Sequence, residues 1–248
     1  MLCWLGLMVS TLVHFIYFFT AFSHTYMTVH KLPHQLDLLS DHLHLPSLSL
    51  LAWCFLFKQL NPEQNSAATT DYPVINGKIS VSHSATTTFY ALSDDSGIRG
   101  MHCECLHSTP TWHGKGPRYD CVFVSKDVQL PGIKGISVVR IKLFFSFDFE
   151  GVMYPCVLVE WYAKMGRGPD WETRMWKVKP DMSGPGGWRD VSVLHLDAFM
   201  RGAHLLPSFG GDSVPLAFTP TYSLDPFQSY YVNKYIDHHA HEIAYWII

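Results

Sequence analysis

The N-terminal part of this 248-residue chain lacks charge, and the C-terminal part lacks a surplus of either sign. No Lys, Arg, Asp or Glu occurs between Met1 and His30, and residues 98–248 carry fifteen basic and fifteen acidic side chains. A protein that attracts phosphate over long range needs a clear excess of cations. The composition therefore does not predict a strongly basic nucleic-acid binder. With 48% hydrophobic residues, it is typical of a globular protein with a sizeable core.

Several catalytic signatures are also absent. The segment His113-Gly-Lys-Gly-Pro-Arg118 lacks the spacing of a phosphate-binding loop and precedes a predicted strand rather than a helix. No Gly-x-Ser-x-Gly turn and no His-Glu-x-x-His pair occurs. The sequence therefore predicts no catalytic residue and no cofactor.

The cysteines do not form a recognisable framework. Their spacing fits neither a standard zinc pattern nor a dense set of disulfides. Removal of a signal peptide after Ser23 would leave five cysteines, at least one of them unpaired, and no Asn-x-Ser/Thr acceptor for glycosylation occurs. Both facts weigh against a matured secreted protein. The six are Cys3, Cys54, Cys103, Cys105, Cys121 and Cys156.

Residues 1–23 form an apolar leader. The run from Leu2 to Phe22 is long enough to cross a bilayer, because its 21 residues would span roughly 30 Å as a helix. Ala21-Phe-Ser23 also resembles a signal-peptidase site, although the usual positive region is missing. A membrane anchor, a cleaved signal and an unselected leader all fit, and a membrane location follows only if residues 2–22 are used as an anchor.

The rest of the chain divides by composition. Residues 24–60 are a partly apolar connecting segment, in which Leu48–Phe57 is short enough to be interfacial or part of a core. Residues 61–97 are rich in Ser, Thr, Asn and Ala and predict a polar linker with one short strand around Val74–Val81. The ordered domain is predicted over residues 98–248.

The ordered domain has the pattern of a β-rich fold. Residues 119–125, 136–149, 152–162, 174–179 and 191–197 predict strands. Glu150-Gly151 predicts a hairpin turn, and Pro155 predicts an edge or a bulge in the strand that follows it. Within residues 136–149 the alternation places Val139, Ile141, Leu143, Phe145, Phe147 and Phe149 on one face and Arg140, Lys142, Ser146 and Asp148 on the other.

These strands predict a mainly β (α+β) fold, with a small twisted barrel or a bent sheet. A C-terminal amphipathic helix is predicted over residues 225–247, with Asp225 as its cap, Pro226 in the first position and Gln228 as the capping-box partner. His239 falls on the apolar stripe of this helix, where a hydrogen-bonded core histidine is expected. We expect the helix to dock on the β domain and close it.

Two clusters have residue types that bind metals. His238, His241 and Glu242 could meet on one side of the helix and would support metal-dependent catalysis only if a further ligand joined them. Cys103, Cys105 and His107 could bind zinc, although Cys-x-Cys is less favourable than Cys-x-x-Cys. We favour a structural role for both clusters and therefore predict no metal site.

Residues 113–142 carry six basic and two acidic side chains. A solvated strand edge explains such a local surplus, and a modest surface for a partner is the alternative. The candidate partner residues are Arg118, Lys126, Arg140 and Lys142.

The C-terminal half also resembles a known family. Several blocks occur in the order found in the C-terminal region of fungal proteins derived from CACTA (En/Spm-type) DNA transposons, and together they span residues 112–245. The blocks are Trp112–Val122, Val139–Phe147, Gly151–Trp161, Met175–Pro180, Leu194–Gly210 and Tyr231–Tyr245.

This resemblance implies a β-rich accessory module, similar to bromo-adjacent-homology barrels, that binds chromatin protein or nucleic acid in the nucleus. The long upstream region that would hold the nuclease core is absent, so transposase activity is not implied. The chain resembles a truncated, domesticated or decayed transposon protein with a non-catalytic interaction module. The alternative is a single-pass membrane or secreted protein with a soluble β domain.

Overall fold

The computed structural model describes residues 35–43, 45–63, 72–91, 94, 96–127, 129–130, 132–211, 213–214, 216 and 218–245. The apolar leader predicted over residues 1–23 lies outside these residues. Within the described ranges, no helix is both long and apolar enough to cross a membrane.

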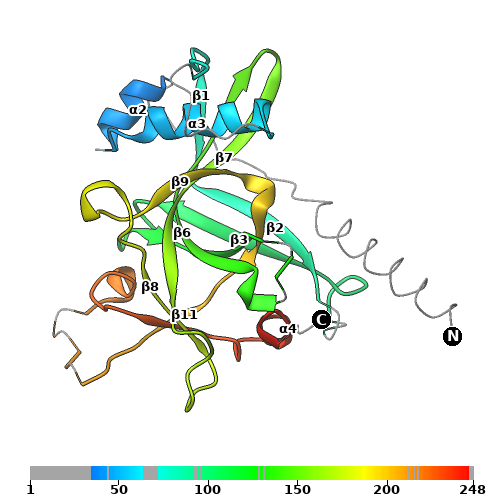
Figure 1. The fold of residues 1–248 in the computed structure, drawn as a ribbon, viewed down its shortest axis with the longest axis vertical. Helices are drawn as coiled ribbons and strands as arrows, with labels where there is room; N and C mark the ends of the chain where they lie inside the picture. The colour runs from blue at the N-terminus through cyan, green and yellow to red at the C-terminus, as the bar shows by residue number, and fades with distance from the viewer. Residues whose placement is uncertain are drawn as a thin grey trace, which may run out of the picture.

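The described chain is mainly β, as the sequence predicts, and its larger sheet curls strongly (Figure 1). The helices are α2 (Leu36–His42), α3 (Leu48–Leu60) and α4 (His238–Tyr245). The strands are β1 (Ile79–Ser82), β2 (Ser84–Tyr90), β3 (Met101–Thr109), β4 (Arg118–Tyr119), β5 (Cys121–Ser125), β6 (Ile136–Phe149), β7 (Val152–Met165), β8 (Trp176–Pro180), β9 (Val191–His195), β10 (Phe199–Gly202), β11 (Leu205–Pro207) and β12 (Tyr230–Val232).

The larger sheet has the strand order β10-β5-β6-β7-β8-β12-β11, and β1 and β9 join it beside β6 and β7. Strands β2, β3 and β4 form a second, three-stranded sheet. The hairpin β6–β7 is the centre of the fold, because β6 pairs with β5 in one half and β1 in the other. Strand β7 likewise pairs with β9 over one stretch and β8 over the next.

The predicted hairpin is confirmed in its details. Glu150 and Gly151 both have positive φ, 53° and 79°, as the favoured two-residue turn requires. Pro155 lies just before the stretch of β7 that pairs with β9, so β6 is its one paired neighbour there. The backbone N of Trp161 points to the β9 side of β7, and by alternation so does the N of Pro155, so its missing N–H breaks no bond to β6.

The predicted two faces of β6 are wrong, because a β-bulge divides the strand. Ile141 pairs with Val159 but Leu143 pairs with Leu158, which leaves Lys142 as an extra residue. One extra residue reverses which side chains point to each face. Val139 and Ile141 therefore enter one core cluster, while Leu143, Phe145 and Phe147 enter another.

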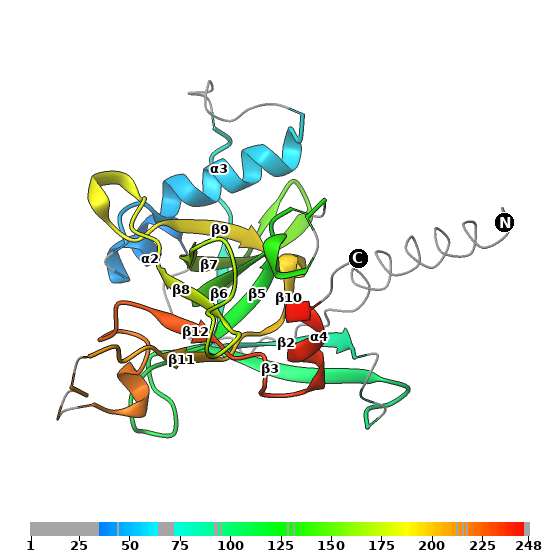
Figure 2. The ribbon, with the colours of Figure 1, turned by 60° about the horizontal axis from the view of Figure 1, so that its bottom comes forward.

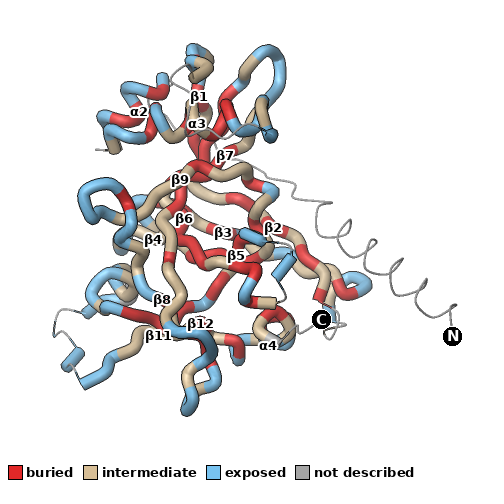
Figure 3. The backbone as a smooth tube through the Cα atoms, viewed as in Figure 1, coloured by how far each residue is buried: buried red, intermediate tan, exposed pale blue. Residues whose placement is uncertain are grey.

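Because of the bulge, the β6–β7 hairpin contributes side chains to three hydrophobic cores. Buried residues run along β5, β6 and β7 through the centre of the molecule (Figure 3). The first core lies under α2 and α3, where Leu39, Leu48 and Leu56 are fully buried. The second lies beside β8 and β12, and the third lies under the β2–β3 hairpin, which contributes Ala85 and Leu106. The segment Leu48–Phe57 is thus part of a core helix.

The linker predicted over residues 61–97 also differs from the structure. It contains β1, close to its one predicted strand, and all of β2, which was not predicted. β2 alternates buried and half-buried positions, but its side chains include four Ser and Thr residues, so the alternation gives little hydrophobic signal. These strands pair with β6 and β3, and the folded unit therefore extends well before residue 98.

The C-terminal helix begins thirteen residues later than predicted, at His238 instead of Asp225. Residues 230–232 form β12, which pairs with both β8 and β11. Asp237 is the actual cap, since its Oδ1 accepts a hydrogen bond of 2.7 Å from the backbone N of Ala240. Residues 230–232 pair with β8 and β11 as a strand, so the helix predicted to start at Asp225-Pro226 does not form there.

A buried arginine attaches α4 to the two sheets. Arg201 on β10 is 4% exposed and donates to both carboxylate oxygens of Asp237, at 2.8 and 2.7 Å. It also donates to Glu104 of β3 at 2.7 Å, and its guanidinium lies 4.6 Å from the ring of Phe89 in β2. Figure 2 shows α4 beside β10 and the β2–β3 hairpin. Four elements thus meet at one side chain.

His239 belongs to the same cluster, as the sequence predicts for a core histidine. Its Nδ1 lies 3.3 Å from Nη1 of Arg201, and its ring stacks on Phe89 at 4.6 Å. Burial and the neighbouring Arg201 cation lower the pKa of His239 to about 4. The ring is therefore neutral at pH 7 and accepts a hydrogen bond from the guanidinium.

We expect Arg201→Met to lower the free energy of unfolding by about 3 kcal/mol, because it leaves two partly buried carboxylates without their cation. The matched control is Arg174→Met, which removes an exposed arginine packed on Trp171 and should cost below about 1 kcal/mol. Chemical denaturation of the two variants measures the difference. Equal losses would show that the buried cluster does not stabilise the fold.

The protein should lose stability between about pH 6.5 and pH 4 through His239. In this window the unfolded chain, with the ordinary pKa of 6.5, binds a proton that the folded chain does not, so stability falls as the pH falls. The full effect is on the order of 3 kcal/mol. His239→Phe keeps the stacked ring and has no titrating group, so its unfolding free energy should change less over the window. Identical pH profiles would contradict this role.

Candidate functional site

The four candidate partner residues do not form a basic surface, because Arg140 is buried. Arg140 is 4% exposed, and its Nη1 donates to Oδ1 of Asp225 at 2.5 Å. Burial opposes its ionisation, but the bonds and charge of Asp225 outweigh this and raise its pKa. Asp225, predicted as a helix cap, is instead the counter-ion of Arg140.

The other three cations have partners within the chain. Arg118 is paired with Asp120 at 2.8 Å, and Lys142, at the bulge, is paired with Glu160 at 3.2 Å. The ammonium of the exposed Lys126 lies 5.3 Å from the ring centre of Trp161. A contact with nucleic acid through these positions would therefore compete with existing partners.

The histidines of α4 separate in the structure. His239 is buried, whereas His238 and His241 are exposed and Glu242 is half-buried. Their exposure places the two candidate ligands in solvent on the helix surface. Within the described residues, no group of three His, Cys, Asp or Glu side chains is placed to hold a metal ion.

The cysteine cluster lies on the outer face of the β2–β3 hairpin. Cys103 and Cys105 are both exposed, and residues two apart in a strand share a face. The Sγ of Cys105 lies 3.6 Å from Nε2 of His107. Cys121, by contrast, is buried, and burial raises the pKa of its thiol to about 12.

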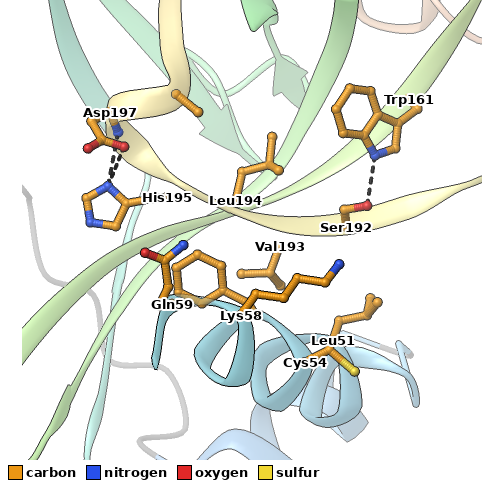
Figure 4. A pocket seen from close by; sticks show the side chains of 12 residues that line it. Leu51, Cys54, Lys58, Gln59, Trp161, Ser192, Val193, Leu194, His195 and Asp197 are labelled. Carbon is orange, nitrogen blue, oxygen red and sulfur yellow. Dashed lines mark hydrogen bonds and ion pairs between the residues drawn. The ribbon is translucent and has the colours of Figure 1, made fainter. Parts of the chain in front are cut away.

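The structure also contains a groove that sequence reasoning missed. It lies between α3 and β9, has a volume of about 590 Å³, and is shown in Figure 4. We call it the α3–β9 groove. It is lined by Leu51, Cys54, Phe55, Lys58 and Gln59 of α3, by Ser192, Val193, Leu194 and His195 of β9, and by Trp161, Asp197 and Ala198.

One side of the α3–β9 groove is the open edge of a strand. Among the described residues, β9 pairs with β7 alone. The backbone N of Trp161 donates to the carbonyl of Asp190. In an antiparallel pair, every second residue directs its backbone N–H and C=O groups toward the neighbouring strand. The backbone groups of Ser192 and Leu194 therefore point to β7, and those of Val191, Val193 and His195 point away from it.

Apolar side chains form the floor of the groove and polar groups mark its ends. Phe55 stacks on His195 at 6.4 Å, and His195 pairs with Asp197 at 2.5 Å, which lowers the pKa of that carboxyl. Figure 4 shows the exposed Lys58 extending along the groove, with Cys54 and His195 at opposite ends. The thiol is thus not placed for proton transfer to the histidine, and the groove is suited to binding.

The sequence held a partial signal for this site. The sequence shows an apolar segment at Leu48–Phe57 and predicts a strand over residues 191–197, but neither observation shows that the two lie side by side. The edge position of β9 depends on which strands pair, and this is a long-range property.

No family model, no curated protein and no solved structure matches the chain. The transposon resemblance therefore stays a prediction that depends on the order of the sequence blocks.

The amides along β9 should differ in hydrogen exchange. We expect Val193 and His195, which point away from β7, to exchange at least about tenfold faster than Ser192 and Leu194, because a free edge is open to water. Amide exchange followed by NMR measures all four. Equal protection would show that another segment covers this edge.

Proposed function

We propose that this protein is a non-catalytic interaction module that binds an extended peptide segment of a partner protein in the α3–β9 groove. The observation that carries the proposal is the open edge of β9 along the groove. An exposed strand edge presents unpaired N–H and C=O groups, which an incoming peptide can satisfy by adding a strand. Neighbouring pockets then select its side chains.

The groove favours a particular kind of peptide. Leu51, Phe55 and Val193 offer apolar contacts for alternate side chains of an added strand. Lys58 adds a positive charge that is exposed to solvent, so it favours an acidic side chain or a C-terminal carboxylate on the peptide. The expected ligand is therefore an extended peptide with aliphatic residues and a negative charge.

This proposal agrees with the interaction module implied by the transposon resemblance, which names a chromatin protein as the source of the peptide. A likeness to bromo-adjacent-homology barrels and a closing role for the C-terminal helix belong to the same proposal. The nucleic-acid alternative has less support, because Arg140 is buried and Arg118 and Lys142 are paired with carboxylates.

A displayed library of random peptides, selected on the whole protein, tests the proposal. Selected peptides should shift the NMR signals of Val193 and His195. Val193→Pro should abolish binding, because it removes a backbone N–H that points away from β7 into the groove, and proline is tolerated at such positions of an edge strand. Val193→Ala is the matched control, since it shortens the side chain but keeps the N–H.

The charge preference has its own control. Lys58→Glu should weaken acidic peptides about threefold, as expected for an exposed ion pair. Lys115→Glu makes the same change at an exposed position outside the groove and should have no effect. Peptides that bind Val193→Pro as tightly as the wild type would refute strand addition.

A further inference from the structure

A second arrangement of side chains lies on the outer face of the β2–β3 hairpin, away from the α3–β9 groove. It contains Cys105 and His107 of β3 and Asp120, which lies between β4 and β5. The Sγ of Cys105 lies 3.6 Å from Nε2 of His107, and Nδ1 of His107 lies 3.2 Å from Oδ2 of Asp120. A thiol, an imidazole and a carboxylate are thus connected in series.

The carboxylate is held in place by its other contacts. Arg118 donates to both oxygens of Asp120, at 2.8 and 3.2 Å, and the backbone N of His107 donates to Oδ2 at 2.9 Å. These bonds leave Asp120 as a fixed acceptor facing Nδ1. The imidazole therefore carries its proton on Nδ1, and Nε2 is free to accept the thiol proton of Cys105.

Aromatic packing fixes the imidazole from a different side. The ring of Trp112 meets that of His107 edge to face at 4.2 Å, and the guanidinium of Arg118 lies 4.6 Å from the Trp112 ring. The side chain of His107 is 13% exposed. Its orientation is therefore set by the fold, as general-base action requires.

This geometry differs from a metal site. Metal ligands converge on one point, whereas here one imidazole lies between the thiol and the carboxylate and contacts each through a different nitrogen. The same three residue types therefore form a proton relay.

The neighbouring cysteine provides an internal comparison. Cys103 lies on the same face of the same strand and is also exposed. His107 contacts the thiol of Cys105, so a difference in reactivity between the two thiols reports on His107.

We propose that Cys105 is a nucleophilic thiol, activated by His107 and oriented by Asp120, that reacts with disulfides reaching this exposed face. The thiol proton passes to Nε2 of His107 while the sulfur attacks one sulfur of the incoming disulfide, whose S–S bond breaks. The departing thiolate takes the bonding electron pair and then a proton from the imidazolium. The products are a mixed disulfide on Cys105 and one free thiol, so the protein thiol is oxidised as the incoming disulfide is reduced.

The test uses 5,5′-dithiobis(2-nitrobenzoate) as the disulfide and the whole protein at pH 7. Acid-quenched samples are mapped by mass spectrometry, which reads each cysteine separately. In Cys103→Ser, Cys105 should form its adduct on the order of tenfold faster than Cys103 does in Cys105→Ser. Adding His107→Gln to Cys103→Ser should lower the rate at Cys105 to that of Cys103.

Asp120→Asn tests the positioning residue. It should lower the rate at Cys105 by a smaller factor than His107→Gln does, and it should change how that rate depends on pH. Circular dichroism and the adduct rate of the buried Cys156 show whether each variant is folded, because unfolding would raise that rate sharply. Equal rates for Cys103 and Cys105, or a Cys105 rate that His107→Gln leaves unchanged in a folded protein, would overturn the proposal.

Discussion

The single extra residue at Lys142 is the constraint on which the rest of the fold depends. A regular β6 would present all of its alternate apolar residues to one layer. The bulge instead divides them, so Val139 and Ile141 pack under the β2–β3 hairpin while Leu143, Phe145 and Phe147 pack under α2 and α3. One hairpin can then be covered on both faces, which explains why nearly every position of β6 is buried or half-buried.

The two buried arginines join parts of the chain that the hydrophobic cores leave separate. Arg140 of β6 binds Asp225, and Arg201 of β10 binds Glu104 and Asp237, so carboxylates from β3 and from the C-terminal region are joined to two strands of the larger sheet. A buried guanidinium demands specific acceptors in fixed directions. The apolar clusters supply most of the driving force, and these pairs fix which segment docks where.

Local patterns predicted the centre of the fold and missed its periphery. Residues 136–149 and Glu150-Gly151 combine strong alternation with a fitting turn, so local signals suffice there. β2 becomes a strand by pairing with β3, and β12 by pairing with β8 and β11, although neither has a strong local pattern. Asp225 binds Arg140 instead of capping a helix. For the candidate sites, Cys105 and His107 were visible as neighbours in sequence, but Asp120 reaches them only because β3 pairs with β4.

The ion pairs of the two arginines have a consequence for synthesis of the chain. Arg140 precedes its carboxylate by 85 residues, and Arg201 precedes Asp237 by 36. While the chain emerges from the ribosome, Arg140 of β6 lacks its counter-ion until Asp225 has been made, and Arg201 of β10 has Glu104 but not yet Asp237. The buried ion pairs of both arginines are therefore completed late in synthesis, after the central hairpin has been made.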